Sequence, residues 1–360
     1  MNEMLHETET KRAAFLKSAG WERAQAAPLA GDASTRRYER LQMDGKPAIL
    51  MIAPPAAETP DCPTGASADE RRSLGYNAMA RLAGPNLNAF VAVSNALRDA
   101  GLSAPEIYAA DPAQGFALLE DLGDDLFVRV AGKVDEHLLY KAAVEALAAL
   151  HEARVRPPAS DAYSMLEYDE VAFEAEVTLL TEWYWPLKKG APIGDDLYQE
   201  YISLWRDALS SLSAPHVPVL RDYHAENLLW LPDRKGAARV GVIDFQDALF
   251  GHAAYDLVSL LEDARRDVAR ALADEMLAHY VGHADANFDH EGFSRDYAIL
   301  ATQRNAKILG IFARLAKRDN KPRYLDLLPR VEAHFRNDLR REPLAPLSKF
   351  IEKHLPELAP

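Results

Sequence analysis

The stretch that decides the fold runs from Leu220 to Asp247 and reads LRDYHAENLLWLPDRKGAARVGVIDFQD. Asp222 is followed five residues later by Asn227, and Asp244 comes after an apolar run. Phosphoryl transfer from a nucleotide uses such a set: one carboxylate orients the attacking hydroxyl, and an amide and a second carboxylate hold Mg²⁺ against the phosphates. Asp222 is therefore the candidate for orienting the hydroxyl. Asn227 and Asp244 are the candidate metal ligands, because their oxygen atoms suit Mg²⁺.

The residues around this motif predict a loop followed by a short β-hairpin. Leu228–Trp230 is apolar and begins a strand, Asp233–Gly236 reads as a turn, and Arg239–Ile243 forms a strand that delivers Asp244 at its end. A surface loop with capping Asp and Asn residues before an ordinary hairpin would give the same local pattern. The motif therefore depends on its wider context.

That context is a resemblance to the aminoglycoside phosphotransferase and choline kinase-like superfamily. Its catalytic loop is usually written H-G-D-x-H-x-x-N, and its metal-binding strand ends I-D-F or I-D-W. His224 and Asn227 match the loop, with Asp222 in the place of the catalytic aspartate, while Leu220-Arg221 replaces the usual His-Gly. Further similar blocks are Gly31–Tyr38, Leu118–Gly123 and Gln303–Arg314. Within the superfamily the sequence is most similar to bacterial cell-wall-recycling kinases that phosphorylate N-acetylmuramate and N-acetylglucosamine at the anomeric hydroxyl.

The resemblance implies an α+β, protein-kinase-like fold of two lobes. Residues 1–122 would form a nucleotide-binding lobe around a small antiparallel sheet, and residues 123–360 a mainly helical lobe for catalysis and acceptor binding. It also implies ATP and Mg²⁺ as cofactors and an amino sugar as acceptor, with a 1-phosphate product for peptidoglycan recycling. Other acceptors remain open, namely an aminoglycoside, choline or homoserine. So does a non-catalytic module that only senses nucleotides.

Local patterns agree with this division. Tyr38–Met43 alternates in polarity, Asp44-Gly45 is a hairpin signal and Ala48–Ile52 is a short apolar strand. Helical periodicity dominates after residue 135, in segments 135–151, 169–185, 195–212, 253–283, 291–316 and 323–339. Residues 54–89 look like an insertion that could be a lid or a loop, with a short helix at 68–83. We favour a loop.

The residues expected to bind the nucleotide differ from the family pattern. Gly31 and Ser34 would lie in a turn over the phosphates, where small residues allow close approach of backbone N–H groups. Met51 stands about where the superfamily places a lysine, so we expect Arg37 or Arg36 to neutralise the phosphates instead. By resemblance, the backbone of Glu120 and Leu122 would meet the adenine edge.

The acceptor side is predicted from an aromatic and acidic segment at residues 174–185. Glu182, Trp183 and Tyr184 could grip a sugar ring by stacking and hydrogen bonds, or could belong to the core. His224 and Asp247 are further candidates for acceptor contacts, and Asp247 could equally be a cap on the following turn. For the cluster Gln303, Arg304, Lys307 and Arg314 we favour a solvated basic face over a cleft.

Composition limits the classes of partner. The formal net charge of −14 over 360 residues disfavours a general nucleic-acid or anionic-membrane binder. The single cysteine, Cys62, cannot form an intrachain disulfide, and no signal-like segment opens the sequence. We therefore expect a cytoplasmic protein with small-molecule partners, an amino sugar and ATP, and no nucleic acid or membrane. The sequence does not fix the oligomeric state.

Overall fold

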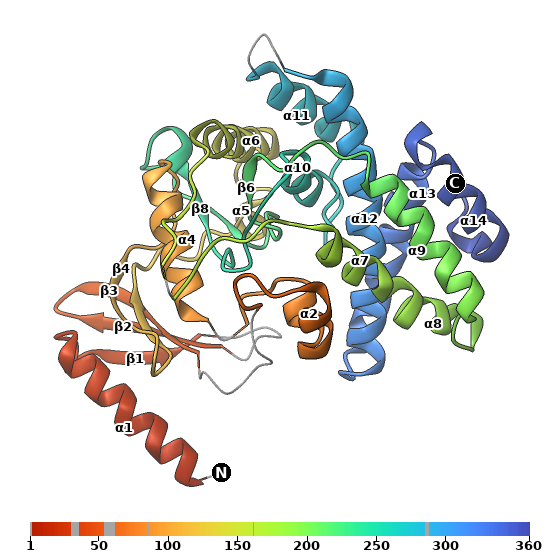
Figure 1. The fold of residues 1–360 in the computed structure, drawn as a ribbon. Helices are drawn as coiled ribbons and strands as arrows, with labels where there is room; N and C mark the ends of the chain where they lie inside the picture. The colour runs from red at the N-terminus through yellow and green to blue at the C-terminus, as the bar shows by residue number, and fades with distance from the viewer. Residues whose placement is uncertain (1, 30–35, 54–61, 85, 161, 285–287) are drawn as a thin grey trace.

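A five-stranded antiparallel sheet forms the N-terminal lobe of the computed structural model (Figure 1). The structure describes residues 2–29, 36–53, 62–84, 86–160, 162–284 and 288–360. The strands are β1 (Gln25–Pro28), β2 (Arg37–Met43), β3 (Lys46–Ile52), β4 (Ile107–Asp111) and β5 (Phe116–Leu119), in the order β1-β2-β3-β5-β4. The predicted hairpin at Asp44-Gly45 is confirmed, because Met43 pairs with Lys46 across it.

The two faces of this sheet are covered by different helices. Leu50 belongs to a small apolar cluster with Phe15 of α1 (Asn2–Ser18), which lies along the outer side of the sheet. Met51 points to the opposite face, because successive strand residues alternate. There it joins the main core with Phe90 and Val93 of α4 (Leu87–Asp99), and it is fully buried.

The insertion between β3 and α4 contains two helices, α2 (Ala68–Leu74) and α3 (Tyr76–Met79). Ser67 and Glu70 form a capping box at the start of α2, in which each side chain binds the other's backbone N–H. Gly75, with φ 98°, separates the two helices. The short helix predicted at 68–83 is thus present, divided into two at Gly75, and the choice of a loop over a lid for 54–89 stays a prediction. Residues 54–61 and 85 of that segment lie outside the described residues.

The C-terminal lobe is mainly helical, as predicted. Its α-helices are α5 (Phe127–Val130), α6 (Glu136–Ala153), α7 (Glu170–Leu179), α8 (Trp185–Lys189), α9 (Asp195–Leu209), α10 (Ala254–Leu261), α11 (Arg270–Gly282), α12 (His290–Lys317), α13 (Leu328–Asp338) and α14 (Ala345–His354). A π-helical turn, Leu180–Tyr184, joins α7 to α8, and 3₁₀ turns occupy Gly236–Arg239, Pro322–Leu327, Glu342–Leu344 and Pro356–Leu358. Two small antiparallel pairs, β6 (Val217–Val219) with β9 (Leu249–Gly251) and β7 (Leu228–Trp230) with β8 (Val240–Val242), carry the motif of the opening stretch.

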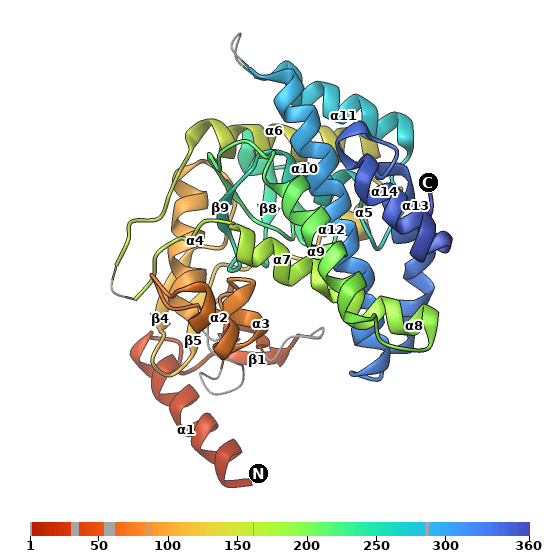
Figure 2. The same cartoon turned by 45° about the vertical axis from the view of Figure 1, so that its right-hand side comes forward.

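Helix α12 runs through the middle of this lobe, beside α7, α10 and α13 (Figure 2). Its approach to α7 requires a glycine, because a β-carbon at Gly310 would lie 2.3 Å from the carbonyl oxygen of Leu179. Phe90 of α4 stacks on Phe245 with ring centroids 4.8 Å apart. The residue after Asp244 therefore packs directly against the helix of the N-terminal lobe.

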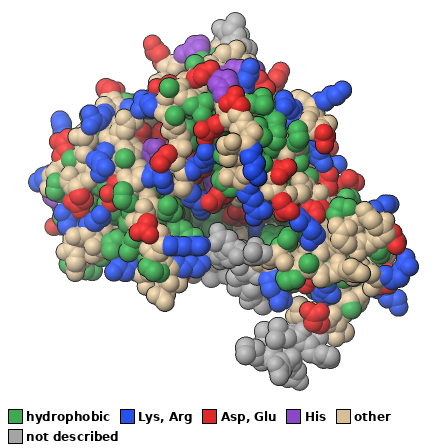
Figure 3. Space-filling model, turned by 180° about the vertical axis from the view of Figure 1, so that it is seen from behind, with side chains coloured by type: hydrophobic (Ala, Val, Ile, Leu, Met, Phe, Trp, Pro, Cys, Tyr) green, Lys and Arg blue, Asp and Glu red, His purple; other side chains and the backbone are tan. Residues whose placement is uncertain are grey.

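The surface agrees with a protein of mixed charge. On the face shown in Figure 3, acidic and basic side chains of the described residues are interspersed, without an extended basic stripe. None of the described helices is both long and apolar enough to cross a membrane.

Candidate active site

Asp256 of α10 holds the backbone of the loop that carries Asp222. The two carboxylate oxygens of Asp256 accept hydrogen bonds from the backbone N–H groups of Leu220 (2.6 Å) and Arg221 (2.9 Å). Burial raises the pKa of Asp256 to about 7, although both hydrogen bonds oppose this shift. Arg221 has φ 71°, a conformation that costs energy for a residue with a side chain. The loop thus has a strained backbone that a buried carboxylate fixes in place.

The hairpin brings the candidate metal ligands together. Asn227 directly precedes β7 and Asp244 follows β8 after one residue, so pairing of Leu228 with Val242 places them side by side. The Asn227 amide Nδ2 donates to the backbone oxygen of Asp222 at 3.0 Å and lies 3.5 Å from Asp244 Oδ2. Asp244 has φ 60°, which turns its side chain out of the strand direction. The hairpin expected from the sequence is confirmed, with β8 shortened to Val240–Val242.

The two aspartates of the site have opposite pKa shifts. Burial would raise the pKa of Asp222, but positive charges led by Lys307 outweigh it and hold the pKa below its ordinary value. The pKa of Asp244 is raised, first by its enclosure in the cleft and then by the negative charge of Asp222. Gln246 Nε2 donates to Asp244 Oδ1 at 2.9 Å. The Asp244 carboxylate and the neighbouring Asn227 amide supply hard oxygen ligands that fit Mg²⁺.

His224 supports the loop from inside. It is 3% exposed, and burial together with the nearby Arg265 lowers its pKa to about 4, so the ring is neutral near pH 7. Its Nε2 lies 3.1 Å from Arg265 Nη1 and 3.4 Å from Asn227 Nδ2. These contacts fit a role in orienting Asn227 better than the acceptor contact predicted from the sequence.

A buried cluster of charges lies behind the loop. Glu176 of α7 is fully buried, and its carboxylate binds Arg221, Lys307 Nζ at 2.9 Å and Gln303 Nε2 at 2.8 Å. Burial would raise the pKa of Glu176, but Lys307 and Arg221 lower it to about 2. Apart from its place in an acidic segment, nothing in the sequence pointed to Glu176.

The same cluster corrects one prediction. We favoured a solvated basic face for the Gln303 to Arg314 part of α12, but Gln303 is fully buried and Arg304 is 3% exposed. Arg304 Nη2 donates to Ser259 Oγ at 2.8 Å, and Ser259 Oγ in turn donates to the backbone oxygen of Arg221 at 3.3 Å. The basic side chains of α12 therefore face the catalytic loop.

The helical insertion docks on the C-terminal lobe through Arg71. This side chain is 2% exposed, pairs with Asp169 through two hydrogen bonds of 2.5 and 3.0 Å, and also donates to the carbonyl oxygens of Ala78 and Met79. Because Asp169 also caps the start of α7, the insertion and α7 share one anchor. An exposed loop would not have a buried ion pair of this kind.

Two further bonds tie the insertion to the catalytic segment itself. Arg221 Nη1 donates to the carbonyl oxygen of Ala80 at 3.1 Å, and Asp247 Oδ1 accepts from the Ala83 backbone N–H at 2.6 Å. Burial raises the pKa of Asp247. These bonds show Asp247 in contact with the insertion and not as a cap on its own turn, and its acceptor contact stays a prediction. Its carboxylate links the metal-binding loop to the insertion.

The nucleotide side distinguishes the two candidate arginines. Arg36 Nη2 donates to the carbonyl oxygen of Gly84 at 3.0 Å, and its charge acts on both Asp244 and Asp247. Arg37 is exposed and shares the sheet face that carries α1, opposite to Tyr38. Placement therefore favours Arg36 over Arg37. The predicted turn residues Gly31 and Ser34 lie outside the described residues.

The connection after β5 has the backbone groups expected for an adenine edge. The N–H of Glu120 donates to Glu106 at 2.8 Å, and its carboxylate binds Arg98 and Arg234, so its carbonyl oxygen is the group left for a ligand. Among the residues that the structure describes, none forms a backbone hydrogen bond with Leu122, which is half-buried. Both positions thus fit the prediction.

Of the three acceptor candidates in the aromatic segment, Glu182 and Trp183 interact through their side chains, and Tyr184 lies apart from them. Tyr184 is fully buried and donates its hydroxyl to Glu332 Oε1 at 2.7 Å, so it belongs to the core beside α13. Trp183 is half-buried and Glu182 is exposed. The carboxylate of Glu182 interacts with the charge of Arg314, which lies 5.2 Å from the Tyr76 ring centroid.

A pocket opens beside the catalytic segment rather than over it. It lies between the insertion and the metal-binding loop, and Cys62, Arg81, Asn86, Tyr163 and Gln246 are among its lining residues. Burial raises the pKa of the Cys62 thiol, which therefore has little thiolate character.

Comparisons with known proteins agree with this geometry. The phosphotransferase enzyme family matches residues 25–294. A protein of Caulobacter vibrioides named N-acetylmuramate/N-acetylglucosamine kinase is 42% identical over 355 residues, covering 97% of each chain. A protein of the same name from Pseudomonas aeruginosa is 33% identical over 341 residues, covering 91% of this chain and 88% of the relative.

Solved structures show the same fold at low identity. A choline kinase from Streptococcus pneumoniae matches with a TM-score of 0.58 at 14% identity, covering 91% of this chain and 99% of the other. A choline/ethanolamine kinase family protein from Mesorhizobium loti matches with a TM-score of 0.57 at 16% identity, covering 99% of each chain. The expected two-lobed, protein-kinase-like fold is confirmed, and the chain belongs to the phosphotransferase enzyme family.

Proposed function

We propose that the protein is an ATP-dependent kinase that phosphorylates N-acetylmuramate and N-acetylglucosamine at the anomeric hydroxyl. The observation that carries this proposal is the 42% identity, over 97% of both chains, with a kinase named for these two sugars. The geometry supports it, because Asp222, Asn227 and Asp244 lie in one short segment with the roles that phosphoryl transfer requires. The product would be a sugar 1-phosphate.

Asp222 would act mainly by position. Its carboxylate is held ionised by the positive charges of α12 and can accept a hydrogen bond from the acceptor hydroxyl. A weakly basic carboxylate suffices, because transfer through a loose transition state depends on orientation and charge neutralisation more than on early proton removal. The anomeric hydroxyl is also more acidic than the other ring hydroxyls. Asp222 would receive its proton late in the reaction.

Asn227 and Asp244 would hold Mg²⁺, which, when bound, neutralises charge on the nucleotide phosphates. Gln246 and His224 keep these ligands in place: Gln246 donates to Asp244, and His224 lies beside the Asn227 amide. The raised pKa of Asp244 supports this assignment, because a carboxylate placed next to another negative charge gains most from a cation.

ATP would bind between the lobes. The carbonyl of Glu120 and the N–H of Leu122 would meet the adenine edge, and Arg36 would bind phosphate oxygens. Met51 motivated the alternative of a non-catalytic nucleotide sensor, but its side chain is fully buried against α4. Where the superfamily has a lysine, this chain therefore has an apolar core contact. Arg36, whose charge acts on Asp244, would supply the positive charge for the phosphates.

We place the acceptor between α3 and α12. The charges of Glu176, Lys307 and Arg314 act on Tyr76, and the Arg314 guanidinium lies over its ring. One aromatic ring and two cations therefore border this side of the catalytic loop. A sugar ring can stack on an aromatic face. The cations suit the carboxylate that N-acetylmuramate carries and N-acetylglucosamine lacks.

ATP consumption against a panel of acceptors tests the proposal. The panel contains N-acetylmuramate, N-acetylglucosamine, choline, homoserine and an aminoglycoside, each with ATP and Mg²⁺. Turnover of both amino sugars is expected. Activity on choline, homoserine or the aminoglycoside alone would reject the sugar assignment, while ATP binding without turnover of any acceptor would support the sensor. A cytoplasmic location fits ATP as the phosphoryl donor.

A further inference from the structure

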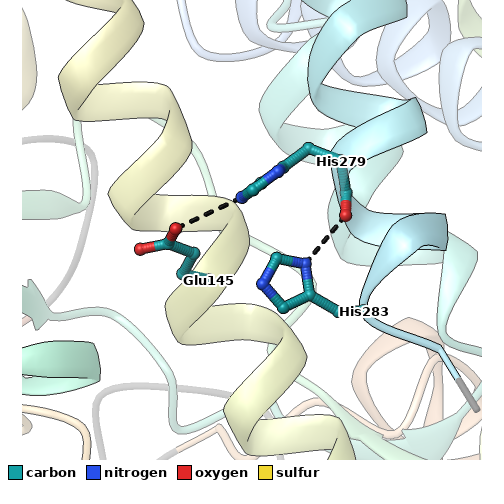
Figure 4. A group of neighbouring side chains, drawn as sticks. All are labelled: Glu145, His279 and His283. Carbon is teal, nitrogen blue, oxygen red and sulfur yellow. Dashed lines mark hydrogen bonds and ion pairs between the residues drawn. The ribbon is translucent and has the colours of Figure 1, made fainter.

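A ladder of histidine and acidic side chains joins α6 to α11 outside the candidate active site. On α6 it contains His137 and Glu145, on α11 it contains Glu275 and His279, and His283 is the C-cap residue of α11. His137 Nε2 lies 2.8 Å from Glu275 Oε1, and His279 Nε2 lies 3.2 Å from Glu145 Oε1. Figure 4 shows Glu145 of α6 facing His279 and His283. The kinase chemistry proposed above uses none of these residues.

We propose that Glu145, His279 and His283 form a binding site for a divalent transition metal of the Zn²⁺ type. Imidazole nitrogen and carboxylate oxygen are ordinary Zn²⁺ ligands, and His283, the C-cap residue of α11, follows His279 by four residues. The three ligand atoms lie within 4.8 Å of one another. Glu145 and His283 are exposed, which leaves room for water at a fourth position.

The spacing of the first two ligands already suits a metal. Two ligands with bonds of about 2.0–2.1 Å at a tetrahedral angle lie about 3.4 Å apart. The distance of 3.2 Å between His279 Nε2 and Glu145 Oε1 is close to this value. His283 offers the third ligand atom, which lies within 4.8 Å of the other two.

The third ligand has the supporting contact that metal-binding histidines use. His283 Nδ1 lies 2.8 Å from the backbone oxygen of His279, so this nitrogen carries the proton and donates it. The lone pair is then on Nε2, the atom available to a metal. Metal ligands of this kind usually donate their other ring N–H to a carbonyl or carboxylate, which fixes the tautomer and the ring orientation.

A metal here would fasten α11 to α6. Helix α11 packs on the core through the buried Met276 and Tyr280 and through four partly buried apolar residues, Leu272, Ala273, Leu277 and Val281. A ligand that binds only the folded state raises stability by mass action. Imidazole-rich sites favour Zn²⁺ over Mg²⁺ and Ca²⁺, so the site should not compete for the Mg²⁺ of the active site.

Zinc titration of the full-length protein, prepared without a polyhistidine tag, tests the proposal. Isothermal titration calorimetry would be run in excess Mg²⁺, so that the oxygen ligands of the active site are occupied. We expect saturable binding of one Zn²⁺ per chain. His279→Ala and His283→Ala should each weaken it by at least ~10-fold, since loss of a supporting contact alone costs a metal site that much.

His137→Ala is the matched control, because it removes a histidine of the same ladder that is not a proposed ligand. Its zinc affinity should equal that of the wild type. The melting temperature should rise with Zn²⁺ in the wild type and in His137→Ala but not in His279→Ala. Absence of saturable zinc binding in the wild type, or unchanged affinity in a His279→Ala/His283→Ala double variant, would overturn the site and leave an ordinary His–Glu ion pair.

Discussion

Asp256 Oδ1 accepts a hydrogen bond of 2.9 Å from the backbone N–H of Arg221, the residue immediately before the candidate catalytic aspartate. The second oxygen of the same carboxylate binds the N–H of Leu220. Helix α10 thus sets the backbone that presents Asp222, in a conformation that Arg221 would not adopt on its own. The position of Asp222 is therefore determined by a buried residue thirty-four positions later in the chain.

Asp256→Asn should lower kcat by roughly 10–100-fold, because the new amide NH₂ would face a backbone N–H and displace the loop. The Michaelis constant for ATP should change little, since Asp256 contacts only the loop. Steady-state kinetics below the unfolding range would measure both. Asp296→Asn is the control: Asp296 is also buried and binds the backbone N–H of Ser213 at 3.2 Å, away from the site. An equal loss of kcat in both variants would show a general stability effect.

Asp244→Asn should raise the Mg²⁺ concentration needed for half-maximal activity, because it replaces a charged oxygen ligand by a neutral one. The substitution preserves the size of the side chain and should leave the fold intact. The measurement is a Mg²⁺ titration of initial rates at fixed ATP. A Mg²⁺ dependence identical to that of the wild type would place the metal elsewhere.

Arg36→Gln should raise the Michaelis constant for ATP strongly and that for the sugar much less, because the charge of Arg36 acts at the carboxylate side of the cleft. The neighbouring Arg37→Gln removes the same charge from the opposite face of β2, so it should leave both constants near the wild-type values. The reverse result, a defect only in Arg37→Gln, would contradict the placement.

His151→Gln should reduce the sensitivity of the fold to acid. Burial lowers the pKa of His151 to about 3, below the ordinary value of 6.5 that the unfolded chain has. Between these values the unfolded state binds more protons, so the free energy of unfolding falls as pH decreases. Through His151 alone, the free energy of unfolding should fall by about 2 kcal/mol between pH 7 and pH 5.

Urea unfolding at the two pH values measures the effect. The Gln variant can still hydrogen bond toward Tyr280, which lies 2.7 Å from His151 Nδ1, and it has no group that titrates in this range. Equal losses of stability in the wild type and the variant on acidification would show that His151 does not contribute.

The catalytic hairpin was predictable because its chemistry is local. Asp222, Asn227 and Asp244 lie within one short stretch, and a turn between two apolar runs brings its ends together. The helices of the C-terminal lobe were also predictable from their periodicity. The segment 253–283 is in fact two helices, α10 and α11, and periodicity alone did not mark the break.

The supports of the site were not predictable, because they come from distant parts of the chain. Glu176, Asp256 and Lys307 acquire their roles only when α7, α10 and α12 pack against the loop. From the sequence alone, the basic residues of α12 are predicted to form a solvent-exposed face, because charged side chains are usually exposed. Here Lys307 pairs with the buried carboxylate of Glu176, and Arg304 donates to the hydroxyl of Ser259. Arg71 was missed for the same reason.

The measurement that tests the central claim most directly is phosphorus NMR of the reaction products formed from N-acetylglucosamine and from its methyl glycoside, each with ATP and Mg²⁺. If Asp222 orients the anomeric hydroxyl, the free sugar should give ADP and an anomeric phosphate, and Asp222→Asn should slow this by at least ~10²-fold. The methyl glycoside, which lacks that hydroxyl, should consume no ATP. Phosphorylation of the methyl glycoside at the rate of the free sugar would contradict the account.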